Sequence, residues 1–148
     1  MMIAAAIAAA IGSAGALAIA YRVRRLYLVV TVVGGSMQPA FASGDRLLVR
    51  RTTLDRVRRG AAVVVTLPAP GGPDDPPPNP AHEVMVKRAV ALPGDAVPDG
   101  VKVADALVPP HHLVVIGDNP NGSYDSRYVG YVPAQALLGV VVRRMAIR

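Results

Sequence analysis

The sequence predicts a mainly β protein, in which a compact antiparallel β domain over residues 22–148 follows one N-terminal transmembrane helix over residues 1–21. Three observations support this fold class. The first twenty residues carry no charged side chain, short apolar segments rich in β-branched residues follow them, and turns containing glycine or proline separate those segments. A chain of 148 residues suits one such domain with a modest core.

The N-terminal segment is dominated by Ala, Ile and Leu, and twenty helical residues span about 30 Å, the thickness of a bilayer core. We favour a retained membrane anchor over a cleaved signal peptide because no basic residue precedes the apolar stretch. A buried helix is the third interpretation, but it would need a polar stripe or caps. Arg22, Arg24 and Arg25 follow directly. The positive-inside rule would place them in the cytoplasm, although anionic headgroups of either leaflet can also hold them.

The rest of the chain has the pattern of short β segments joined by turns and loops. Residues 68–80 include seven prolines and form a predicted surface loop, since proline supports neither a helix interior nor a central strand. Turns are expected at 93–95 and 98–100, a polar loop at 117–126 and a short helix at 133–138. The predicted strands cover residues 26–33, 45–51, 61–67, 82–92, 113–116 and 139–147.

Composition excludes several classes of function. The chain has no cysteine, which excludes disulfides, thiolate catalysis and cysteine-ligated zinc. A net charge of +6 would suit nucleic acid or an anionic membrane surface, but aromatic residues are scarce and no helix-turn-helix pattern is present. We therefore expect no nucleic-acid partner. His82, His111 and His112 form no ligand cluster, so no metal site is expected, and a catalytic triad through His82 is a minor alternative.

A serine on a sharp turn is the first candidate for chemistry. Two glycines, Gly34 and Gly35, end an apolar segment directly before Ser36, and a proline follows at position 39. Glycine permits unusual backbone dihedrals and close approach of a substrate chain. The backbone N–H groups beside such a serine can stabilise a developing oxyanion. An ordinary Gly-Ser turn is the other interpretation of the same residues.

A lysine inside an apolar strand is the second candidate. Fourteen of the sixteen basic residues are Arg, and only Lys87 and Lys102 are Lys. Arginine stays protonated in proteins, whereas the pKa of a desolvated lysine can fall toward neutrality. A neutral amine can then remove a proton from a serine hydroxyl. A lysine that extends from a strand edge into solvent is the alternative.

The polar segment over residues 117–127 is the third candidate, because it gathers hydrogen-bonding side chains directly after an apolar strand. A hydroxyl in it can orient a lysine, and an Asp–Arg pair can rigidify it. A solvated turn rich in Asp and Asn is the alternative interpretation.

Together these segments resemble the signal peptidase I family, the Ser–Lys endopeptidases that remove signal peptides. The matching motifs are Gly35 to Pro39, Lys87 to Asp95 and Gly117 to Arg127, in this order behind a membrane segment. The resemblance covers the whole chain. The segment between Lys87 and Gly117 is short, so we expect this chain to lack the large accessory β domain of some family members.

The resemblance implies roles for individual residues. Ser36 is similar to the nucleophile, Lys87 to the general base, and Ser123 to the hydroxyl that orients the lysine. Asp125 and Arg127 resemble the structural salt bridge near the site, and the backbone N–H of Ser36 would form the oxyanion hole. The family uses no cofactor. It also implies shallow pockets for small residues, which by position would be lined by Val30, Val32, Met37, Met85 and Val86.

The expected activity is membrane-anchored hydrolysis of signal-peptide-bearing precursors after small residues, at Ala-x-Ala sites, with the domain outside the cytoplasm. A dedicated maturation peptidase with one client is the first alternative, and a cytoplasmic one would explain the arginines after the anchor best. A non-catalytic membrane-bound peptide-binding module is the second. A self-cleaving repressor-type protein is the third, but it should carry a DNA-binding domain, for which the N-terminal segment is a poor candidate.

Overall fold

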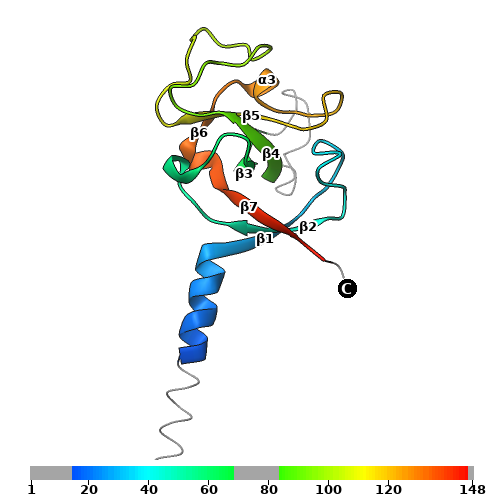
Figure 1. Ribbon diagram of the computed structural model, residues 1–148, viewed down its shortest axis with the longest axis vertical. Helices are drawn as coiled ribbons and strands as arrows, with labels where there is room; N and C mark the ends of the chain where they lie inside the picture. The colour runs from blue at the N-terminus through cyan, green and yellow to red at the C-terminus, as the bar shows by residue number, and fades with distance from the viewer. Residues whose placement is uncertain (1–14, 69–83, 147–148) are drawn as a thin grey trace, which may run out of the picture.

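The computed structural model describes residues 15–68 and 84–146, which form a β domain behind a projecting helix (Figure 1). The helix covers residues 15–26 and leads directly into the first strand, so it continues past the predicted boundary at residue 21. Most of the predicted anchor, residues 1–14, lies outside the described residues. Within the described part of the chain, no helix is long and apolar enough to cross a membrane. The helix leaves several large apolar side chains exposed, namely Leu17, Ile19, Tyr21, Val23 and Leu26.

Seven strands of the described residues form one antiparallel arrangement in the order β1-β2-β7-β3-β4-β5-β6. The predicted mainly β, antiparallel fold class is therefore confirmed. Between these strands, the described ranges 15–68 and 84–146 contain three short helical turns: η1 at Leu54–Arg56, α3 at Ser126–Val129 and η2 at Ala134–Ala136. The strands are β1 (Tyr27–Thr31), β2 (Arg46–Arg50), β3 (Ala62–Thr66), β4 (Val84–Ala91), β5 (His112–Ile116), β6 (Val132–Pro133) and β7 (Leu137–Met145).

Each predicted strand overlaps an observed one, and the differences lie near the C-terminus. The short helix expected at 133–138 is only the 3-10 turn η2, and strand β7 already begins at Leu137. Leu137 is buried in the core opposite Val65, so its packing favours the extended conformation. Ser126, expected in a loop, begins α3 instead. The proline-rich segment lies outside the described residues from position 69 to 80, and so does His82.

The core explains why the central strand β3 is apolar on both faces. Val63 and Val65 belong to one cluster of buried side chains, whereas Val64 belongs to a second. Successive side chains of a strand point to opposite faces, so this alternation means that both faces of β3 are covered. All three valines are 0% exposed. Burial of each contributes about 1.5–3 kcal/mol relative to an exposed valine.

Curling of the sheet positions the site. In the strand order, β2, β7 and β3 separate β1 from β4. Side chains from β1 and β4 nevertheless line one pocket. The sheet therefore bends round until its first strand faces the fifth in the order, which brings the turn after β1 to the middle of β4. The polar loop that follows β5 reaches the same place, because its backbone bonds to that turn.

Candidate active site

The turn after β1 presents Ser36 at the edge of the domain. Gly34 has φ of +86°, a conformation that side chains disfavour, so the chain reverses sharply before the serine. Met37 follows with 1% exposure and anchors the turn in the core. The N–H of Gln38 donates to the carbonyl of Gly35 over 3.1 Å. Ser36 itself is half-buried, so its side chain remains accessible from the pocket beside it.

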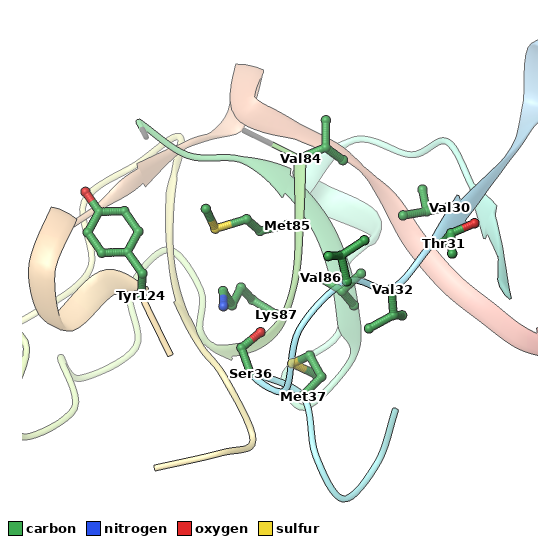
Figure 2. A pocket seen from close by; sticks show the side chains of 11 residues that line it. Val30, Thr31, Val32, Ser36, Met37, Val84, Met85, Val86, Lys87 and Tyr124 are labelled. Carbon is green, nitrogen blue, oxygen red and sulfur yellow. The ribbon is translucent and has the colours of Figure 1, made fainter. Parts of the chain in front are cut away.

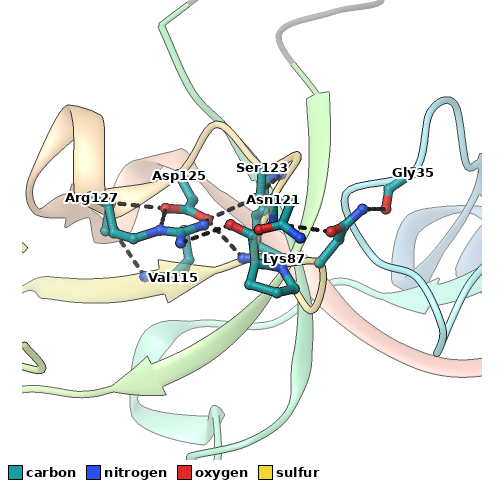
Figure 3. Close-up of polar contacts among 11 residues, drawn as sticks. Gly35, Lys87, Val115, Asn121, Ser123, Asp125 and Arg127 are labelled. Carbon is teal, nitrogen blue, oxygen red and sulfur yellow. Dashed lines mark hydrogen bonds and ion pairs between the residues drawn. The ribbon is translucent and has the colours of Figure 1, made fainter. Parts of the chain in front are cut away.

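Lys87 lies in the middle of β4 and is only 2% exposed. It stands directly opposite the buried Val63, so its stem packs on an apolar face of the sheet. Burial lowers the pKa of Lys87 below its ordinary value of 10.5; the charge of Asp125 opposes this decrease, and that of Arg127 adds to it. The Nζ atom donates a hydrogen bond to Ser123 Oγ over 3.1 Å (Figure 3).

Asp125 organises the polar loop. Its carboxylate is fully buried and accepts from Ser123 Oγ at 2.7 Å, from the Gly117 N–H at 2.9 Å and from two Arg127 nitrogens at 2.9 Å each. Burial alone would raise the pKa of Asp125, but the hydrogen bonds from Arg127, Gly117 and Ser123 lower it to about 2. The carboxylate therefore stays charged in the folded protein, and the hydroxyl proton of Ser123 is committed to it.

Gly117 is the point of closest approach between the loop and the serine turn. A methyl group added at this glycine would lie 2.1 Å from Ser123 Oγ and 2.6 Å from the carbonyl oxygen of Ser36. No larger residue fits without displacing one of them. The next residue, Asp118, pairs with Arg88 on the opposite face of β4 from Lys87, and Arg88 also donates to the Gly60 carbonyl. Two neighbouring residues of β4 thus bind the polar loop: Lys87 contacts Ser123, and Arg88 contacts Asp118.

An apolar cavity of about 250 Å³ opens beside Ser36 and Lys87 (Figure 2). The structure brings together in its wall all five residues that the resemblance placed there, three from the β1 side and two from β4. Four further lining residues were not predicted: Thr31, Val33, Val84 and Tyr124. Of these, Tyr124 comes from the polar loop, directly after Ser123.

Two contributions of the polar loop were not predicted from the sequence. Tyr124 stacks on Tyr128, with ring centroids 5.6 Å apart and an interplanar angle of 25°. Tyr124 precedes Asp125, the extended residue that caps the N-terminus of α3, so no helical spacing marks this pair in the sequence. Asn119 hydrogen-bonds to the serine turn, and for this contact the sequence offers no periodic signal.

A serine on a tight turn and a buried lysine of lowered pKa line one apolar pocket, and these features define a candidate Ser–Lys hydrolase site. Comparison with known proteins supports this class. The family described as signal peptidase, peptidase S26, matches residues 3–100 and 96–146. The chain therefore belongs to the signal peptidase (S26) family, which confirms the resemblance drawn from the three motifs.

Individual relatives cover most of this chain but less of their own length. A probable signal peptidase I-2 from Synechocystis is 30% identical in an alignment 132 positions long, which covers 73% of this chain and 58% of the relative. The signal peptidase I of Leptolyngbya laminosa is also 30% identical, over 74% of this chain and 64% of its own. Mouse mitochondrial inner membrane protease subunit 1 is 32% identical over 75% of this chain and 64% of its own. The chain thus spans about three fifths of the length of these relatives.

Proposed function

We propose that this chain is a membrane-anchored serine endopeptidase that removes signal peptides from exported precursors after small residues, with Ser36 as nucleophile and Lys87 as general base. The observation that carries this proposal is the buried Lys87 in the same apolar pocket as Ser36. An apolar environment favours the neutral amine, which is the form that can accept a proton.

The polar loop supports the role of Lys87 by fixing the direction of its amine. The hydroxyl proton of Ser123 goes to Asp125, so Ser123 Oγ can only accept from Lys87. An N–H of the amine is then directed at Ser123, and the lone pair of the neutral amine is free to face Ser36. Arg127 keeps Asp125 charged and so maintains this direction.

The proposed reaction proceeds in two steps. Neutral Lys87 takes the hydroxyl proton as Ser36 Oγ bonds to the scissile carbonyl carbon, and the backbone N–H of Ser36 stabilises the oxyanion. The C–N bond then breaks, the protonated lysine gives its proton to the leaving amine, and an acyl-enzyme remains. Lys87, neutral again, takes a proton from a water molecule as the water oxygen bonds to the acyl carbon. The bond between that carbon and Ser36 Oγ then breaks, and the protonated lysine returns its proton to Oγ, which regenerates Ser36.

The pocket supports a preference for small side chains. Apart from Thr31 and Lys87, its walls are aliphatic or sulfur-containing on the sides formed by β1 and β4, and its volume is about 250 Å³. A substrate in extended conformation places alternate side chains on the same face. Small residues one and three positions before the cut would then enter this cavity, as in an Ala-x-Ala site.

The proposed activity also determines on which side of the membrane the β domain would lie. Signal-peptide-bearing precursors reach the outer surface of a membrane, so the β domain would lie outside the cytoplasm and the anchor in the lipid. The arginines at positions 22, 24 and 25 would then lie at the headgroups. A tag at the C-terminus should be accessible from outside intact cells, and protection of that tag would contradict this placement.

The first experiment is cleavage of a membrane-bound precursor with an Ala-x-Ala site by the full chain. Wild type should cut it, whereas Ser36→Ala and Lys87→Ala should lose the activity while remaining folded by circular dichroism. Lys102→Ala is the matched control, because Lys102 is the other lysine of the chain and is exposed. Activity that survives in Lys87→Ala would disprove the mechanism.

Two other functions are outcomes of this test. If wild type leaves the general reporter intact but cuts one native precursor, the chain is a dedicated maturation peptidase with the same catalytic residues. If it binds such peptides without cutting any, and Ser36→Ala binds them equally well, the chain is a peptide-binding module.

A further inference from the structure

Asn119 connects the polar loop to the turn that carries Ser36 through two hydrogen bonds. Its side-chain Nδ2 donates to the carbonyl of Gly35 over 3.1 Å, the contact whose dashed line ends at Gly35 in Figure 3. Its backbone N–H donates to the carbonyl of Ser36 over 3.0 Å. Asn119 is half-buried and lines no part of the pocket, so it contributes to the site only through the serine turn.

The orientation of the Asn119 amide is itself determined by a third contact. The Oδ1 atom accepts from the backbone N–H of Asn121 over 3.1 Å. With the oxygen directed at a donor, the amide nitrogen must face the Gly35 carbonyl. The amide group is therefore held at both ends and acts as a rigid bridge between the loop and the turn.

Because peptide units are planar, the hydrogen bonds from Asn119 also determine the direction of the Ser36 N–H group. In a trans peptide unit the C=O of one residue and the N–H of the next lie in one plane and point in opposite directions. The bond from Asn119 to the Gly35 carbonyl therefore fixes the direction of the Ser36 N–H. The bond to the Ser36 carbonyl fixes the next peptide unit in the same way. The Gly35 carbonyl also accepts from the N–H of Gln38 within the turn. Asn119 adds a second hydrogen bond to this carbonyl from a segment outside the turn.

The bridge has a fixed base. Asp118, the neighbour of Asn119, pairs with Arg88 on β4 through both of its oxygens, and the exposed fractions of these two side chains are only 18% and 32%. The direction of the Ser36 N–H is thus fixed relative to β4, the strand that also carries Lys87. One strand consequently sets the position of the proposed base and of the proposed oxyanion donor.

We propose that Asn119 is a positioning residue, which aims the backbone N–H of Ser36 at the oxyanion of the transition state. This inference rests on the proposed function. A donor of this kind acts on the charge that develops in the reaction and contributes little to the binding of the ground state. Disturbing Asn119 should therefore lower kcat and leave KM nearly unchanged.

The test compares Asn119→Asp with Asn119→Ala in the full chain. The aspartate keeps an acceptor for the Asn121 N–H but directs a second oxygen at the Gly35 carbonyl. The two oxygens repel each other, so the hydrogen bond that restrains this carbonyl is lost. We expect kcat on an Ala-x-Ala peptide to fall about ten- to hundred-fold in Asn119→Asp, less than the loss of a whole oxyanion donor, and by a smaller factor in Asn119→Ala. KM should change less than about two-fold.

A transition-state analogue separates positioning from a general loss of structure. A peptide aldehyde bonds to the serine and places an oxyanion in the same hole, so its inhibition constant should rise by the factor by which kcat/KM falls. Asn121→Ala is the control, because Asn121 donates to Asn119 through its backbone N–H, which alanine keeps, and its side chain is exposed. Concentrations should be corrected by active-site titration, so that a smaller folded fraction does not imitate the effect.

The possible outcomes distinguish the two proposals. If wild type is active and Asn119→Asp retains both its kcat and its affinity for the aldehyde, the positioning role is wrong and the proposed function stands. If KM rises with kcat unchanged, Asn119 acts in substrate binding and the positioning role is also wrong. If wild type neither cleaves a precursor nor reacts with the aldehyde at Ser36, the proposed function fails, and this inference with it. If Asn119→Asp does not fold, the same comparison is made with Asn119→Ala, from its kcat and its inhibition constant for the aldehyde.

Discussion

The amine of Lys87 donates to the hydroxyl of Ser123 over 3.1 Å in a place where the lysine is almost completely buried. The same hydroxyl donates to the charged carboxylate of Asp125 over 2.7 Å. A buried ammonium without a close carboxylate is costly, because its desolvation is not compensated. Here a neutral hydroxyl lies between the two charges, so burial prevails and the pKa of Lys87 is lowered.

The lowered pKa of Lys87 predicts the pH dependence of both activity and stability. Cleavage should increase with pH as the lysine loses its proton, and should level off below pH 10.5. Between the lowered pKa and 10.5 the unfolded chain binds a proton that the folded chain does not, so the free energy of unfolding should increase with pH in this window. Urea titrations at several pH values measure the second effect, and kcat/KM measures the first.

Lys87→Met is the control for the stability measurement, because methionine keeps most of the apolar stem and has no proton to lose. The rise in unfolding free energy over this pH window should be smaller in Lys87→Met than in wild type by the contribution of one titrating group. Equal slopes in the two proteins would mean that Lys87 is not the group with the shifted pKa.

Much of the fold followed from local pattern, because alternation and turn residues act over a few positions. The strand over 82–92 was predicted from its apolar character, and the observed β4 buries Lys87 and turns the neighbouring Arg88 toward Asp118. Alternation along a strand is sufficient for this division of roles. The grouping of Ser36 with Lys87 came from the resemblance rather than from pattern, since nothing local indicates how the sheet curls.

The charge state of Asp125 predicts a loss of stability in acid. Its pKa is about 2 in the folded protein against an ordinary value of 3.8, so the stability it contributes is complete above pH 4 and is lost as the pH falls through 2. The difference corresponds to about 2 kcal/mol. In Asp125→Asn the unfolding free energy should be lower at pH 7 and should change less between pH 4 and pH 2. A variant curve parallel to that of wild type in this window would contradict the assignment.

Close approach at Gly117 predicts that its replacement by alanine is not tolerated. The added methyl group would overlap Ser123 Oγ and the Ser36 carbonyl, and one of them must move. Overpacking of this kind costs about 1–3 kcal/mol, and the displaced atoms belong to the proposed machinery. Gly117→Ala should therefore have a lower thermal unfolding midpoint than wild type. It should also lose most of the cleavage activity.

Gly122→Ala provides the comparison for Gly117, because it makes the same substitution in the same loop. Its added methyl group would meet the nearest atom, Asn119 Nδ2, at 3.4 Å, an ordinary contact. This variant should retain a thermal midpoint and cleavage rate close to those of wild type. A similar loss in both variants would show that the loop, rather than the contact at Gly117, is sensitive to added bulk.

What could not be predicted involves contacts between distant segments. Asn119 and Gly35 are 84 positions apart, and their hydrogen bond exists because the sheet curls until β1 faces β4. Tyr124 reaches the pocket for the same reason. No periodicity in the sequence reports such a closure, because it depends on the twist and bulges of several strands together, such as the register shifts between β2 and β7 and between β3 and β7.

Tyr124 predicts a change in substrate preference when its ring is removed. The half-buried Tyr124 lines the pocket together with Met85 and Lys87 (Figure 2). Its ring stacks on that of the exposed Tyr128. Tyr124→Ala should enlarge the pocket, so kcat/KM for a substrate with valine before the cut should rise relative to alanine by about ten-fold, the effect of one or two methylene groups in an apolar pocket. Tyr124→Phe keeps the ring and should retain the wild-type ratio. An unchanged ratio in Tyr124→Ala would mean that the walls from β1 and β4 alone set the size limit.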